Sequence, residues 1–90
     1  MELKSNTYFN SEEIQVWLIN YIATLLKIDQ AEVDPQKPFR EFGMDSMTAL
    51  GMLGDLSDFL GCEDLEASVL YKYTTIEKLS QYLAAERRRQ

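Results

Sequence analysis

Residues 42–60 have the sequence FGMDSMTALGMLGDLSDFL, which combines a turn with the start of a helix. Gly43 suits a sharp turn because glycine adopts backbone conformations that other residues avoid. The apolar residues that follow recur three or four positions apart, which predicts an amphipathic helix over roughly 45–60. Asp45 or Ser46 is suited to cap its N-terminus.

Two glycines lie inside this predicted helix, and each weakens a helix by about 1 kcal/mol relative to alanine. Gly51 and Gly54 therefore indicate either close approach of a neighbouring element or a soft end of the helix. Gly61 is a natural stop signal after the last apolar residue.

On the N-terminal side, a second amphipathic helix is predicted over about 11–27, and Asn10 and Glu13 have the spacing of a capping box. A long loop over about 28–44 follows, because prolines and a glycine disfavour a helix there. Its apolar residues are expected to fix the loop against the core. These residues are Ile28, Val33, Phe39 and Phe42.

On the C-terminal side, a short helical turn is predicted around Glu66–Leu70, and the last helix is predicted to start at Thr74, which has capping-box spacing with Glu77. No alternating strand pattern and no repeat is present in the sequence. We therefore predict an all-α fold, a four-helix bundle of three main helices and one short helix with a long first loop. The predicted domain organisation is a lead-in over 1–10, a helical domain over 11–86 and a basic tail over 87–90.

The charge distribution points to the kind of partner. The formal net charge is −6, and residues 45–71 contain six acidic residues but no Lys or Arg. Such a surface disfavours nucleic acid and anionic membranes and favours a partner with a basic patch, although charged runs are often only solvated faces. The acidic residues are Asp45, Asp55, Asp58, Glu63, Asp64 and Glu66.

Several classes of function are disfavoured by composition. The chain has no His and a single cysteine, Cys62, which argues against an internal disulfide, a zinc site and most nucleophilic enzymes. An EF-hand calcium loop is also missing from the sequence. Neither a secretory signal nor a membrane-spanning apolar run is evident, so a cytoplasmic monomer without metal or catalytic residues is expected.

Ser46 is the candidate for chemistry. A serine just after a glycine turn, in the first turn of a helix, is exposed, and the N–H groups there favour a phosphate ester. Asp45 beside it is suited to interact with a modifying enzyme. The alternative is that Ser46 is a plain helix cap.

The segment Gly43-Met44-Asp45-Ser46-Met47 resembles the Gly-x-Asp-Ser-Leu signature of acyl and peptidyl carrier proteins, with Met47 in place of Leu. The resemblance extends over roughly residues 12–85 and includes Pro38-Phe39. The stretch 73–79 is similar to a segment of polyketide-synthase carriers, with Thr74 where proline is common.

This resemblance implies that a phosphopantetheinyl transferase attaches 4'-phosphopantetheine from coenzyme A to Ser46, and that the arm then carries an acyl group as a thioester. Met47 and Leu50 become candidates for docking together with the acidic residues, whereas Leu53 and Leu56 are expected in the core. Tyr71 and Tyr73 are minor candidates for lining an acyl pocket.

Residues 53–61 resemble carriers in polyketide pathways that receive fatty acids from an acyl-AMP ligase. The resemblance thus implies an acyl-AMP ligase or acyltransferase, and a ketosynthase or other acyl-modifying enzyme, as partners. Two alternatives stay open: a helical interaction module without a prosthetic group, and a peptidyl carrier of a nonribosomal peptide synthetase.

Overall fold

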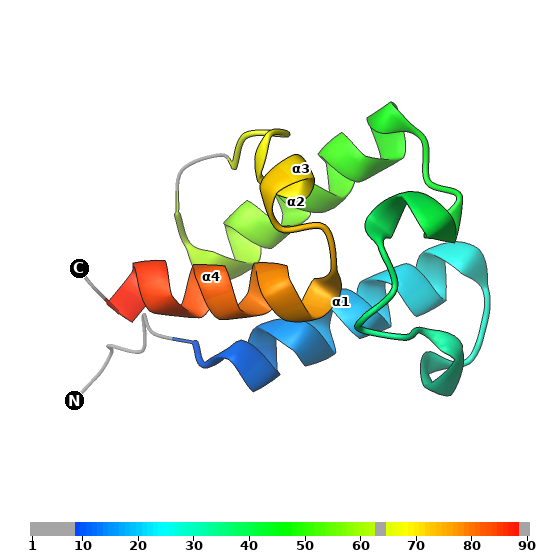
Figure 1. Ribbon diagram of the computed structural model, residues 1–90, viewed down its shortest axis with the longest axis horizontal. Coiled ribbons are helices and arrows are strands. Elements are labelled where there is room, and N and C mark those ends of the chain that lie inside the picture. Colours follow the sequence, from blue (N-terminus) through cyan, green and yellow to red (C-terminus); the bar gives the residue numbers. More distant parts are fainter. Residues whose placement is uncertain (1–8, 63–64, 89–90) are drawn as a thin grey trace.

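The computed structural model describes residues 9–62 and 65–88, and within them the fold is all-α (Figure 1). Two short 3-10 helices lie in the long loop that follows the first helix. This arrangement confirms the predicted four-helix bundle with three main helices and a long first loop. The elements are α1 (Ser11–Leu26), η1 (Gln30–Glu32), η2 (Phe39–Phe42), α2 (Ser46–Leu60), α3 (Val69–Lys72) and α4 (Ile76–Arg88).

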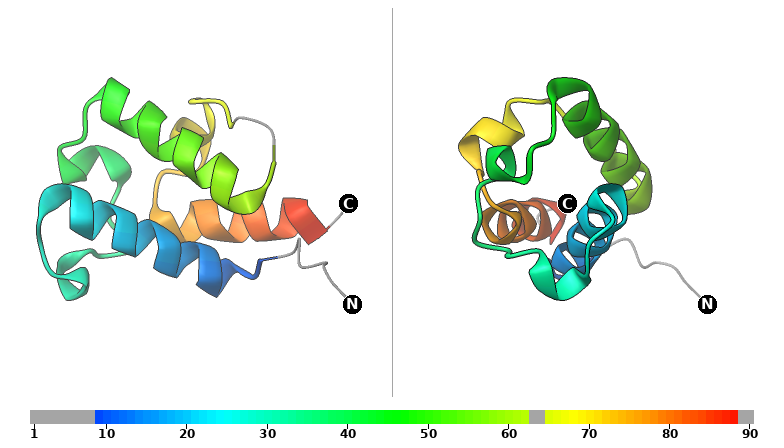
Figure 2. Two further views of the ribbon diagram at one scale, coloured as in Figure 1. Left: turned by 180° about the vertical axis from the view of Figure 1, so that it is seen from behind. Right: turned by 90° about the vertical axis from the view of Figure 1, so that its right-hand side faces the viewer.

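The three long helices lie around a common centre in the end-on view of Figure 2. Their buried apolar side chains form one core there. Each contributes the apolar stripe that its periodicity predicted, and burial of these stripes removes apolar surface from water. Loop residues Val33, Phe39 and Phe42 are also buried, and Ile28 packs against the same core, which confirms that the loop is fixed by its apolar side chains. The fully buried large side chains are Ile14, Leu18, Ile22, Met52, Leu53, Leu56, Ile76 and Leu79.

The helix ends follow local rules. Asn10 and Glu13 form the predicted capping box at α1, with the Glu13 N–H donating to Asn10 Oδ1 at 2.7 Å and the Asn10 N–H donating to Glu13 Oε1 at 3.0 Å. Asp45, rather than Ser46, caps α2. Gly61 ends α2 with φ +69°, as predicted.

The C-terminal helices start later than predicted. α3 begins at Val69 instead of Glu66. At α4 the Lys78 N–H donates to Thr75 Oγ1 at 3.1 Å, so Thr75 is the cap and the predicted pairing of Thr74 with Glu77 is wrong. The reason is that the Thr74 carbonyl accepts the Phe39 N–H at 2.8 Å, which keeps Thr74 in an extended segment.

A short pairing of extended segments connects the first loop to the start of α4. Pro38 and Thr75 form an antiparallel bridge, and the Glu77 N–H donates to the Pro35 carbonyl at 3.0 Å. Together with the bond from Phe39 to Thr74, this pairing fixes η2 beside the loop that precedes α4. It therefore holds two segments that are distant in the sequence side by side.

The two glycines inside α2 are exposed, and a Cβ added at either position would meet nothing within 4 Å. The expectation that a neighbouring element approaches Gly51 or Gly54 closely is therefore wrong. Both residues lie on the outer side of α2, opposite the buried Met52, Leu53 and Leu56. Their cost to helix stability has no packing reason within the part of the chain that the structure describes.

Candidate functional site

Ser46 is the first residue of α2, and its side chain is exposed. Gly43, with φ +78°, turns the chain from η2 toward the helix. Among residues 9–62 and 65–88, none forms a hydrogen bond with the Ser46 hydroxyl. The hydroxyl is therefore accessible for modification, and it lies where the N-terminal end of a helix stabilises negative charge.

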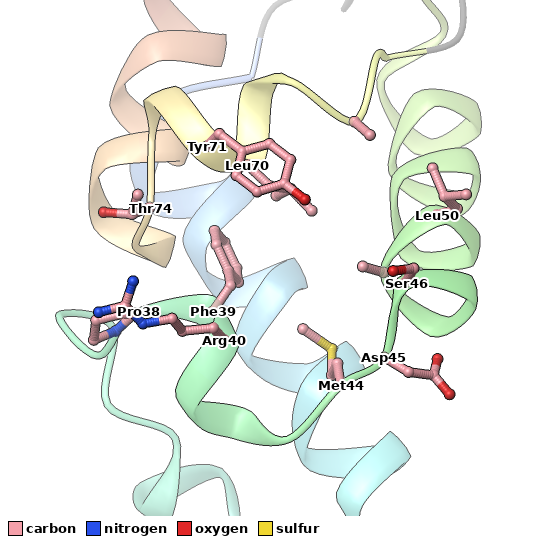
Figure 3. A pocket seen from close by; sticks show the side chains of 12 residues that line it. Pro38, Phe39, Arg40, Met44, Asp45, Ser46, Leu50, Leu70, Tyr71 and Thr74 are labelled. Atoms are coloured by element: carbon pink, nitrogen blue, oxygen red, sulfur yellow. The ribbon is translucent and has the colours of Figure 1, made fainter.

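Asp45 occupies the cap position beside this serine. Its Oδ1 accepts the Thr48 N–H at 2.8 Å. Hydrogen bonds from Thr48, and a weaker one from the Met47 N–H, hold the pKa of Asp45 below its usual range because they stabilise the carboxylate. In Figure 3 the carboxylate points away from the pocket, so Asp45 fixes the start of α2.

A pocket of about 280 Å³ opens beside Ser46 (Figure 3). Three parts of the fold form its walls: η2 and the loop around it, the first turns of α2, and α3 with the segment after it. Its lining is mainly apolar, with polar side chains near the ends. The lining residues are Pro38, Phe39, Arg40, Met44, Asp45, Ser46, Ala49, Leu50, Ala67, Leu70, Tyr71 and Thr74.

Large apolar side chains are unusually exposed around this pocket. Met47 is 79% exposed, Leu50 is 50% exposed and Tyr71 is 83% exposed. Leu50 and Tyr71 line the pocket, whereas Met47 lies outside it. Exposed apolar side chains grouped around a reactive position are typical of interaction surfaces. The core alternative for Met47 and Leu50 is therefore wrong, and Leu53 and Leu56 are buried as predicted.

The acidic candidates differ in their surroundings. Asp58 and Glu66 are exposed, whereas Asp55 is exposed but accepts a hydrogen bond from the Tyr21 hydroxyl at 2.8 Å. Burial raises the pKa of Tyr21, and the hydrogen bond to the Asp55 carboxylate adds to this effect. Glu63 and Asp64 lie outside the described residues.

The tyrosines separate into two roles. Tyr71 lines the pocket, but Tyr73 stacks on Tyr82 with ring centroids 4.2 Å apart and lies outside the lining. Of the two aromatic candidates for a pocket, the structure thus brings only Tyr71 to the site.

Cys62 is a free, half-buried thiol at the far end of α2 from Ser46.

Most of the other lining residues were not identified as site residues from sequence, among them Arg40, Met44, Leu70 and Thr74. Met44 lies within the serine motif and Arg40 lies close to it, but nothing local indicates which side of the loop faces α3. Thr74 had one signal, because it stands where proline is common in the family that the chain resembles. That signal concerned only the start of the last helix. It did not indicate a pocket, because the pocket is formed by tertiary packing of distant segments.

The site contains no arrangement for metal chemistry in the part of the chain that the structure describes, because no three His, Cys, Asp or Glu residues are grouped there. None of the described helices is long and apolar enough to cross a membrane. What the site offers is an accessible hydroxyl next to a mainly apolar pocket, which fits a flexible group attached to Ser46.

Comparison with protein families gives a match over residues 16–83 to the family described as "Phosphopantetheine attachment site". The chain is also 37% identical over 76 residues to the acyl carrier protein TtuC of Teredinibacter turnerae, covering 84% of this chain and 86% of that protein. It is 33% identical over 72 residues to a component of the phenolphthiocerol/phthiocerol polyketide synthase of Mycobacterium tuberculosis. That match covers 80% of this chain but 4% of the synthase component.

The fold is similar to a solved carrier structure as well. The acyl carrier protein Asl1650 from Anabaena sp. PCC 7120 superposes with a TM-score of 0.83 at 30% identity, over 94% of this chain and 96% of that one. The similarity therefore includes the helix order and the long first loop, beyond the serine motif alone.

Proposed function

Because this chain belongs to the acyl carrier protein family, whose prosthetic group is 4'-phosphopantetheine, we propose that Ser46 is the attachment residue. The observation that carries this assignment is the exposed Ser46 hydroxyl at the first turn of α2, free of hydrogen bonds to the described residues and next to a pocket. The protein is a carrier, not a catalyst.

The residues around Ser46 have distinct tasks in this function. The N-terminal N–H groups of α2 stabilise the negative charge of a phosphodiester on Ser46. Asp45 fixes the start of the helix through Thr48, and Gly43 allows the turn that exposes the serine. When bound, the prosthetic group supplies a thiol that holds the acyl group as a thioester. The protein presents that thioester to its partner enzymes.

The proposed docking surface consists of Met47, Leu50, Asp58 and Glu66, with Asp55, Glu63 and Asp64 as further acidic candidates. The apolar members supply contact area beside Ser46, and the carboxylates steer encounter with basic partners. The partners of this surface are a phosphopantetheinyl transferase, an acyl-AMP ligase or acyltransferase, and a ketosynthase or similar enzyme.

The proposed cargo is a fatty-acyl starter unit for polyketide biosynthesis, loaded by an acyl-AMP ligase. Similarity of this chain to a segment of a polyketide synthase and the sequence of residues 53–61 support this proposal. A peptidyl carrier would have the same site but would accept an aminoacyl group. Location in the cytosol and a monomeric state stay predictions from the sequence.

Intact mass tests the attachment. The protein is incubated with coenzyme A, Mg²⁺ and a broad-specificity phosphopantetheinyl transferase, and a gain of one phosphopantetheine is expected. Ser46→Ala should show no gain. Ser68→Ala is the matched control, because Ser68 is another exposed serine at the start of a helix and its replacement should not affect the gain. A mass gain in folded Ser46→Ala would contradict the assignment of Ser46. The absence of a mass gain in the wild type with two different transferases would also contradict it and would favour an interaction module.

The cargo needs a separate experiment. The modified protein is incubated with ATP and either fatty acids with acyl-AMP ligases or amino acids with adenylating enzymes, and thioesters are detected by mass. Fatty-acyl adducts are expected. Aminoacyl adducts alone would instead identify a peptidyl carrier.

A further inference from the structure

The polar groups of the pocket beside Ser46 are separated by an apolar middle. In Figure 3 Ser46 lies at one end, and the Arg40 and Thr74 side chains lie at the opposite end. Phe39, Met44 and Leu70 lie between the two ends. A ligand that starts at Ser46 and crosses the pocket therefore meets apolar surface first and hydrogen-bond donors afterwards.

The donor end is held in place by the backbone. The Phe39 N–H donates to the Thr74 carbonyl at 2.8 Å, which fixes the residue before Arg40 against Thr74. Thr75, next in sequence, is buried and caps α4. Thr74 is thus anchored by its own carbonyl and is followed by a buried capping residue.

The side chains at this end are free to bind a ligand. Within residues 9–62 and 65–88, neither the Arg40 guanidinium nor the Thr74 hydroxyl takes part in a hydrogen bond or an ion pair. Among the described lining residues, Arg40 alone is a cation. A guanidinium donates hydrogen bonds but accepts none, whereas the threonine hydroxyl does both.

The phosphopantetheine arm has the matching order of groups. Beyond its phosphate it carries geminal methyl groups, then a hydroxyl and amide carbonyls. With the phosphate on Ser46, the order of groups along the arm would place the methyl groups at the apolar middle of the pocket and the hydroxyl and first carbonyl on the side of Arg40 and Thr74. The near part of the arm could enter the pocket directly from Ser46. An acyl chain is attached to the thiol at the far end of the arm, so the arm would have to bend back for the chain to reach the pocket.

The size of the pocket supports the same assignment. At about 280 Å³ it lies just below the range of about 300–1,000 Å³ for sites that enclose a small molecule. It is therefore suited to part of the arm, and too small for the arm and a long acyl chain together.

We propose that Arg40 and Thr74 are positioning residues that hold the near part of the arm across this pocket and leave the acyl chain outside. This proposal rests on attachment at Ser46. These hydrogen bonds lie at a solvent-accessible edge, where water or a partner can replace them, so a partner enzyme can release the arm when it binds. Thr74 supplies a hydroxyl at this end of the pocket, beside the only cation of the described lining.

Nuclear Overhauser effects test the proposal on the modified protein, after intact mass has confirmed that the arm is attached. In the wild type we expect contacts from the geminal methyl groups of the arm to the side chains of Leu70 and Met44. In the variant Arg40→Gln/Thr74→Val we expect these contacts to be lost, with an otherwise unchanged amide spectrum. Lys72→Gln is the matched control, because Lys72 is an exposed cation on α3 outside the lining and its removal should leave the contacts in place.

Wild-type protein without arm contacts would overturn the proposal, as would a double variant that retains them. If the double variant does not fold, the single variant Arg40→Gln is measured instead, because Arg40 is exposed and its replacement should not affect folding. In this variant we expect weaker contacts between the arm and the pocket, and contacts of unchanged strength would overturn the proposal. A hexanoyl-loaded sample provides a second readout. Contacts from the hexanoyl chain to Leu70 in place of the geminal methyl groups would show that the pocket holds the cargo and not the arm. Failure of attachment itself would appear earlier, as an unchanged mass.

Discussion

The Tyr21 hydroxyl donates to Asp55 Oδ2 at 2.8 Å, so a side chain of α1 holds a carboxylate of α2. Tyr21 also stacks on Trp17, with ring centroids 5.1 Å apart, and Trp17 stacks on Phe59 of α2. The hydrogen bond thus extends an aromatic contact between the two helices. One of the proposed docking carboxylates therefore also has a structural role.

This bond predicts a pH dependence of stability at the alkaline end. Burial and Asp55 raise the pKa of Tyr21, so the folded state holds this proton more tightly than the unfolded state. Its contribution is fully present below about pH 10, the unfolded value, and is lost as pH rises through the raised folded value. Urea unfolding of wild type and Tyr21→Phe should show a stability difference that narrows above about pH 10. Parallel pH profiles of the two proteins would contradict the prediction.

Asp45 predicts the opposite dependence at acidic pH. Its folded pKa is lowered, so its contribution to stability is present above about pH 4 and is lost as pH falls through the lowered folded value. Asp45→Asn keeps an oxygen that can cap α2 but removes the charge. We expect wild type to melt above Asp45→Asn at neutral pH, and the two melting temperatures to converge in acid. A difference that persists at the lowest pH would exclude titration of Asp45 as its cause.

Alanine at the two exposed glycines of α2 should stabilise the protein. A Cβ at Gly51 or Gly54 meets nothing within 4 Å, and alanine gains about 0.5–1 kcal/mol over glycine inside a helix. Chemical denaturation should show a higher free energy of unfolding for each variant. Gly43→Ala is the control and should destabilise, because Gly43 has φ +78°. A loss of stability in Gly51→Ala would mean that a further contact opposes the added methyl group.

The start of α4 gives a test that separates two neighbouring threonines. Thr75→Ala removes the side chain that accepts the Lys78 N–H and should cost about 1 kcal/mol of folding free energy, as is typical of a lost N-cap. Thr74→Ala should have a much smaller effect, because its structural bond uses the backbone carbonyl. Thermal or urea unfolding compares the two. Equal losses would place part of the cap on Thr74.

Two leucines of α2 should separate docking from packing. Leu53 is 1% exposed, and Leu53→Ala should cost about 2–5 kcal/mol because it leaves a cavity in the core. Leu50 is half exposed, so Leu50→Ala should leave stability nearly unchanged but lower kcat/KM of the phosphopantetheinyl transferase several-fold. Unchanged transfer kinetics in Leu50→Ala would remove Leu50 from the docking surface for that enzyme.

The features predicted correctly from sequence are those determined locally. The apolar period of α1, the capping box of Asn10 and Glu13, and the glycine that ends α2 each act within a few residues of one another. The exposure of Ser46 was predicted in the same way, because it follows from the turn and the helix start on either side of it.

The features missed depend on contacts between distant segments. The cap of α4 lies one residue beyond the predicted cap because the N–H of Phe39, 35 positions earlier, donates to the Thr74 carbonyl. The pocket is formed by segments from two distant parts of the chain, and no periodicity shows which of their side chains converge. Of the two interpretations of Gly51 and Gly54, only close approach of a neighbour is wrong, because a glycine has no side chain to indicate which neighbour it faces.

The pairing between the first loop and the start of α4 also determines when the pocket is formed. Its bonds join Pro35 to Glu77 and Phe39 to Thr74, so one wall of the pocket requires residues that leave the ribosome long after Ser46. During synthesis, α1 and α2 emerge before the segment around Thr74 and Glu77 has been made. The nascent chain therefore exposes Ser46 before the pocket beside it can form, because that pocket needs the later segment.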